Sequence, residues 1–125
     1  MILLLLQILG AIGRQDLPRE GCAAYLWTVS EPRQLVAMAE PGLLRLSLDG
    51  RPLDLARTAA EGSAGLGLAA VTRYAAGEVS ATLELVVQEQ PNMTKGALAP
   101  AATLTIARAG GDAMVTPVAG MVGCR

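Results

Sequence analysis

The sequence predicts an all-β protein, a small antiparallel β-barrel or sandwich of about seven or eight short strands. Several segments alternate apolar and polar residues, and turn-forming residues separate these segments at intervals of roughly a dozen residues. Two cysteines, Cys22 and Cys124, lie near the two ends of the chain. A disulfide between them would link the N- and C-terminal strands, which favours a closed or nearly closed barrel.

Residues 1–13 are expected to form a signal peptide that is removed by cleavage after Gly13. The run from Ile2 to Gly13 is almost wholly apolar and ends at Arg14. As a helix it would span about 18 Å, too little for a hydrocarbon core of about 30 Å. The tripeptide Ala11-Ile12-Gly13 has the small-x-small pattern of a cleavage site. Because no basic residue precedes the run, a buried N-terminal segment of a cytosolic protein and an uncleaved anchor remain alternatives.

After cleavage, residues 14–125 are expected to form a single β domain with no stable membrane span. A pair of cysteines without C-x-x-C spacing and without any histidine indicates a structural disulfide and an oxidising compartment. The excess of arginine over lysine and the many alanines fit a GC-rich bacterial genome. The structural disulfide and the signal peptide together predict a periplasmic or secreted location.

The clearest strand covers residues 79–87, where Val79, Ala81, Leu83, Leu85 and Val87 share one face. Residues 44–48 alternate in the same way and lead into Asp49-Gly50. That dipeptide predicts a tight hairpin to residues 51–55, because Gly tolerates a positive φ without a Cβ clash.

A second hairpin is expected at Gly110-Gly111-Asp112, between strands at residues 102–106 and 114–118. Pro117 lacks an N–H group and predicts a bulge or an edge in the last strand. Further strands are expected at residues 22–29 and 66–74. Residues 34–40 fit either a strand or a short helix, and the strand is favoured. Residues 59–67 and 88–97 are expected to be loops.

The absence of histidine removes the commonest general base and most zinc sites. Glu84 lies opposite the apolar face of its strand and is expected to be solvated. We expect a non-catalytic protein with no metal and no cofactor; a hydrolase that uses carboxylates alone is a minor alternative. The net charge is −1 and no basic run occurs, so nucleic acid is not an expected partner.

The chain has three aromatic residues, Tyr25, Trp27 and Tyr74. Tyr25 and Trp27 are two residues apart, so they share one face of a strand. The favoured expectation is that this face points inward and that both residues belong to the core; if it points outward they form a partner-binding patch. Arg73 and Tyr74 would extend the patch if the sheet brings the strands together.

The leading functional hypothesis is a periplasmic or secreted protein-interaction module that binds a protein of the cell envelope. The main alternative is a small-ligand carrier that uses the barrel interior. The layout of a leader, a small β domain and a cysteine near each end is similar to that of small periplasmic lysozyme inhibitors. The resemblance covers architecture alone and implies no site residue. The sequence does not indicate an oligomeric state.

Overall fold

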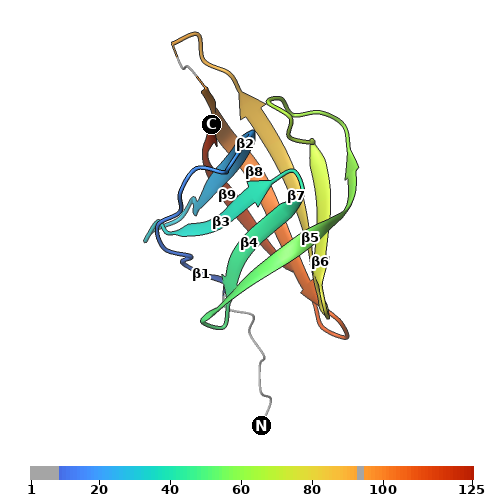
Figure 1. Ribbon diagram of the computed structural model, residues 1–125. Helices are drawn as coiled ribbons and strands as arrows, with labels where there is room; N and C mark the ends of the chain where they lie inside the picture. The colour runs from blue at the N-terminus through green and yellow to red at the C-terminus, as the bar shows by residue number, and fades with distance from the viewer. Residues whose placement is uncertain (1–8, 93–94) are drawn as a thin grey trace.

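The computed structural model describes residues 9–92 and 95–125 and shows a closed antiparallel β-barrel with one additional strand (Figure 1). The additional strand is β1 (Leu9–Gly10). The barrel strands are β2 (Cys22–Thr28), β3 (Leu35–Glu40), β4 (Leu43–Leu48), β5 (Arg51–Glu61), β6 (Val71–Ala76), β7 (Val79–Gln88), β8 (Gly96–Arg108) and β9 (Met114–Cys124). Among the described residues, no helix is long and apolar enough to cross a membrane.

The topology is an up-and-down meander in which each barrel strand pairs with the next one along the chain. Strand β9 returns to β2 and closes the ring over seven residue pairs, from Cys22↔Cys124 to Thr28↔Val118. The predicted all-β class is confirmed, and closure makes the fold a barrel rather than a sandwich. Since every barrel strand has a neighbour on both sides, the ring avoids the unpaired edges of an open sheet.

The two predicted hairpins are confirmed. Asp49 and Gly50 connect β4 to β5 with φ angles of 53° and 78°, the two successive positive values of a tight hairpin turn. Gly110 has a φ of 78° in the connection between β8 and β9. Pro117 lies one residue beyond Val118, where the pairing of β9 with β2 stops. The register of β8 shifts nearby, between Ala99 and Ala102.

Residues 35–40 form strand β3, as favoured over a short helix. Several other element boundaries differ from the sequence-based expectations. Strand β5 continues to Glu61, which pairs with Val71, so the predicted loop at 59–67 begins late. The strand expected at 66–74 starts only at Val71 because Leu68 forms a tight bridge with Gly65 and is buried in the core. Strand β8 begins at Gly96, inside the predicted loop 88–97, whose residues 93 and 94 lie outside the described chain.

The interior of the barrel is one continuous apolar cluster drawn from all eight barrel strands. The predicted inward face of β7 is confirmed, with Val79, Ala81, Leu83 and Leu85 all buried. Since the chain has no phenylalanine, aliphatic side chains fill most of the interior. Six interior leucine and isoleucine side chains are 0% exposed: Leu26, Leu44, Leu46, Leu55, Leu104 and Ile106.

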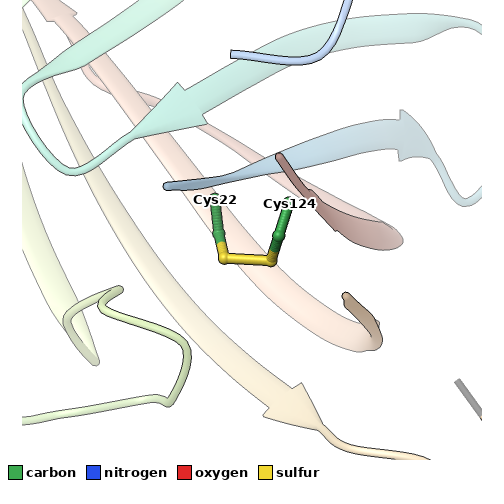
Figure 2. Close-up of a disulfide and its surroundings, with 2 residues drawn as sticks. All are labelled: Cys22 and Cys124. Atoms are coloured by element: carbon green, nitrogen blue, oxygen red, sulfur yellow. A yellow bond between two sulfur atoms is a disulfide. The ribbon is translucent and has the colours of Figure 1, made fainter. Parts of the chain in front are cut away.

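The expected disulfide between Cys22 and Cys124 lies on the seam that closes the ring. The two residues are direct partners on β2 and β9, with their Cα atoms 4.0 Å apart, and the bond spans 102 positions of the sequence. Figure 2 shows the two side chains leaving their strands on the same side to meet at the sulfurs. Both cysteines pack against the interior cluster, so the bridge fastens the barrel from within.

Candidate interaction surface

Strand β2 places Tyr25 and Trp27 on the outer face of the barrel. Their neighbours Ala24 and Leu26 belong to the interior cluster, and successive side chains of a strand point to opposite faces. The sequence favoured an inward position for the aromatic pair, and the structure corrects this by placing both residues on the outer face. Tyr25 is nevertheless buried, at 8% exposure, whereas Trp27 is half-buried. Something outside the barrel therefore covers Tyr25.

Tyr25 is covered by residues 12–18, here called the N-terminal strap, which run along the outside of the barrel before β2 (Figure 1). The Tyr25 hydroxyl donates a hydrogen bond to the carbonyl of Asp16 at 2.7 Å. The Arg125 Nε donates to the Pro18 carbonyl at 2.9 Å, and Pro18 is itself buried. Beneath the strap is a second, outer apolar cluster of Ala23, Tyr25 and Met38, against which Ile12, Trp27 and Leu35 pack.

Charges around the strap act on the Tyr25 hydroxyl. Burial raises the pKa of Tyr25 above its ordinary value of 10.0, and the carboxylates of Glu40 and Asp16 raise it further. The Arg125 guanidinium acts in the opposite direction and lowers it. The hydroxyl is thus kept protonated, which is the form that donates to the Asp16 carbonyl.

Beside the strap, the outer faces of β2, β9 and β8 present an uncovered apolar surface. We call Trp27, Leu98, Ala119 and Met121 the Trp27 surface. These residues line one shallow groove of about 550 Å³, with Arg33 at its rim. Trp27 pairs with Ala119 and Leu98 pairs with Met121, so the four residues lie on three adjacent strands. Leu98 and Met121 are 38% and 47% exposed.

Arg73 and Tyr74 lie away from this surface. Both are on β6, which is four strands from β2 in either direction around the ring. Arg73 is exposed and forms an ion pair with Glu61 at 3.4 Å. Tyr74 points into the barrel, where its hydroxyl donates to the Glu40 carbonyl at 3.0 Å. The structure thus brings Tyr25 and Trp27 together, but it does not join them to Arg73 and Tyr74.

Burial gives Tyr74 a structural rather than a surface role. Burial raises the pKa of its hydroxyl, while a hydrogen bond with Thr72 and the charge of Arg57 act in the opposite direction. As the largest fully buried side chain, Tyr74 fills the interior between strands that otherwise carry aliphatic residues. Its single polar atom is satisfied by a backbone carbonyl, as a buried hydroxyl requires.

An ion pair between Arg45 and Asp54 lies beside the strap. Arg45 on β4 donates to Asp54 on β5 through two hydrogen bonds, Nε to Oδ1 at 2.8 Å and Nη2 to Oδ2 at 3.1 Å. These bonds hold the pKa of Asp54 below its ordinary value of 3.8. The third contact of Arg45, from Nη1 to the Gln15 side-chain oxygen at 3.0 Å, reaches the strap itself.

Three members of the Trp27 surface were not among the candidates from the sequence: Ala119 and the larger side chains of Leu98 and Met121. The two larger residues are the ones that make this surface apolar and exposed. Both lie in segments rich in alanine and glycine that lack clear alternation, so their outward direction is set by pairing with Gln88 and Tyr25 on neighbouring strands. The signal that could have identified Met121 is its position three residues before Cys124. If the disulfide aligns the two ends, that spacing places Met121 opposite Tyr25.

The side chains that could support catalysis are dispersed. Glu84 is exposed on the outer face of β7, as expected from its strand position. Within residues 9–92 and 95–125, no group of three or more histidine, cysteine, aspartate or glutamate side chains is arranged to hold a metal ion. No family model, curated protein or solved structure matches the chain.

Proposed function

We propose that this chain is an exported, non-catalytic binding module that contacts a protein partner through the Trp27 surface. One observation carries the proposal: six leucine and isoleucine side chains of the barrel interior are 0% exposed, while an apolar groove lies uncovered on three adjacent outer strands. Trp27 and Met121 are residue types that are enriched at the centres of protein interfaces, and Arg33 supplies a polar rim. Binding through the outer wall fits this arrangement best.

Export is supported by the disulfide and by the apolar leader. A bond between Cys22 and Cys124 persists in an oxidising compartment and is rare in the cytosol. The predicted cleavage after Gly13 would leave Arg14 as the first residue and preserve the contacts of Gln15, Asp16 and Pro18 with the barrel. The mature protein that we propose therefore keeps most of its strap.

The alternative of a small-ligand carrier receives little support from the interior. A carrier needs a cavity of roughly 300–1,000 Å³. The six interior leucine and isoleucine side chains that are 0% exposed leave no water-sized space against them. A ligand at this position would have to displace packed core residues, at a cost in stability.

Lysozymes are the first defined partners to test. The layout of this chain, a small β domain with a cysteine near each end, resembles that of small periplasmic lysozyme inhibitors. The closed barrel and the disulfide between its terminal strands are consistent with this layout. A panel of lysozymes with and without the purified protein measures this directly as a loss of lytic activity. Inhibition that is lost in Met121→Ser would place lysozyme on the Trp27 surface.

The general test is affinity capture from periplasmic extract, with Met121→Ser and Val115→Ser compared side by side. Both residues are exposed on the outer face of β9, but Val115 lies six positions away, outside the groove. We expect a specific protein partner to bind the wild type and Val115→Ser and to be lost with Met121→Ser. Equal capture by all three proteins would refute the proposed surface.

A further inference from the structure

The end of the predicted leader forms part of the sheet. Leu9 pairs with Leu48, and Gly10 pairs with Ser47, as the antiparallel strand β1. The pairing of β3 with β4 ends at Ala37↔Leu46, so the last two residues of β4 have no partner from β3. Strand β1 pairs with these two residues of β4, at the edge where β3 no longer does.

Two apolar side chains of this segment, three positions apart, are held by the barrel. Leu9 packs against the interior cluster, and Ile12 packs against the outer cluster beneath the strap. Between them the backbone runs along the wall, and the Ile12 N–H donates to the Leu35 carbonyl at 2.9 Å. The segment is therefore bound as an extended peptide, by strand pairing and two apolar contacts.

The ring does not depend on this segment for closure. All eight barrel strands pair with one another, and β9 closes directly on β2. Cleavage after Gly13 would free residues 9–12 from the chain while every barrel strand keeps both of its neighbours. The place beside Ser47 and Leu48 would then be an unoccupied strand position in an otherwise complete wall.

We propose that leader residues 9–12 occupy a peptide-binding site which cleavage vacates, and that the mature protein binds an extended segment of a partner protein there. The ligand would add a strand to β4 and carry apolar side chains at the positions of Leu9 and Ile12. Addition of a strand to an exposed strand edge is a recurring mode of peptide recognition. The inference rests on the export and cleavage proposed above, but it concerns a different surface from the Trp27 groove.

The test uses the full chain with a specific protease site between Gly13 and Arg14. The protein is folded, oxidised, cleaved and freed of the released peptide. A synthetic peptide of residues 5–13 with a solubilising lysine tag is then added. Trp27 is the only tryptophan and packs against the same outer cluster as Ile12, so its emission reports occupancy. We expect a saturable shift of the emission to shorter wavelength.

Two peptides serve as matched controls. The first carries Leu9→Asp and Ile12→Asp, which removes both apolar contacts, and we expect it not to bind. The second keeps every side chain but carries a methyl group on the Ile12 amide nitrogen, which removes the hydrogen bond to Leu35. We expect its affinity to fall about tenfold.

Absence of a saturable response to the unmodified peptide would overturn the inference, and so would an equal response to the double-aspartate peptide. Recovery of the exported protein with residues 9–13 still attached would overturn it as well, because the site would then remain occupied. None of these results depends on Met121, so failure of this site and failure of the Trp27 surface are distinguishable.

Discussion

Tyr25 ties the strap to the barrel through one hydrogen bond, from its hydroxyl to the carbonyl of Asp16 at 2.7 Å. The Asp16 residue is exposed, whereas Tyr25 is buried beneath the strap. The bond therefore links a side chain fixed by β2 to a backbone segment that has no regular secondary structure of its own. Its loss should loosen the strap before it affects the barrel.

We predict that Tyr25→Phe lowers the free energy of unfolding by about 1 kcal/mol or less, because the freed Asp16 carbonyl can bond to water. The larger effect should be local, as faster amide hydrogen exchange in residues 14–18. Tyr74→Phe is the matched control, since its hydroxyl bonds to Glu40 inside the barrel. Unchanged exchange in the strap of Tyr25→Phe would contradict this role for the bond.

We predict that stability declines as the pH rises above about 10. Burial raises the folded-state pKa of both Tyr25 and Tyr74 above 10.0, so the folded state binds more protons than the unfolded state in that range. This contribution is fully present below pH 10 and is lost as the pH rises through the folded-state values. Urea unfolding between about pH 8 and about pH 11.5, on either side of the ordinary tyrosine pKa, measures this contribution. A Tyr25→Phe/Tyr74→Phe variant should show a flatter profile.

We predict that Gly120→Ala destabilises the barrel by about 2 kcal/mol or more. A Cβ at Gly120 would collide with the carbonyl oxygen of Tyr25 and would lie 2.9 Å from the Trp27 ring. The backbone at the seam between β2 and β9 cannot move without disturbing the pairs beside it. Equilibrium unfolding in urea measures the loss.

Gly123→Ala is the control for this substitution. The nearest atom to a Cβ at Gly123 is the Leu17 Cδ2 at 2.9 Å, the end of a flexible and exposed side chain of the strap. We expect a cost below about 1 kcal/mol, since Leu17 can rotate away. Equal destabilisation by the two substitutions would show that the close approach at Gly120 is unimportant.

We predict that replacing both cysteines by serine lowers the free energy of unfolding by about 4 kcal/mol, because the bridge closes a loop of 102 positions. For a domain of this size the melting temperature should fall by more than about ten degrees. Reductant added to the wild type should reproduce most of the change. A fall of only about two degrees in both experiments would mean that strand pairing alone holds the seam.

The sequence predicted those parts of the fold that depend on local chemistry. Asp49-Gly50 was identified because a two-residue hairpin needs positive φ values, and the inward face of β7 was identified because its alternation is regular. The choice between barrel and sandwich was left open, since closure depends on whether β9 returns to β2. That pairing joins residues about a hundred positions apart, and only the two cysteines indicated it.

The candidate site was predicted only in part. Tyr25 and Trp27 share a face, as their spacing indicates, but alternation alone does not say which face is outside. Arg73 and Tyr74 are adjacent on one strand, so at most one of them can face outward. Grouping both with the aromatic pair also required β6 to lie near β2, and the meander places these strands on opposite sides of the ring.

Because of its position, formation of the disulfide is linked to completion of the whole barrel. Strands β3 to β8 all lie between the two sulfurs in the chain, and the sulfurs meet because β9 is aligned with β2. Oxidation in the native pairing therefore records that the final strand has docked in register. In a thiol-trapping time course, the covalent bond would mark the end of assembly, and incomplete chains would be recognisable by their reactive sulfhydryl groups.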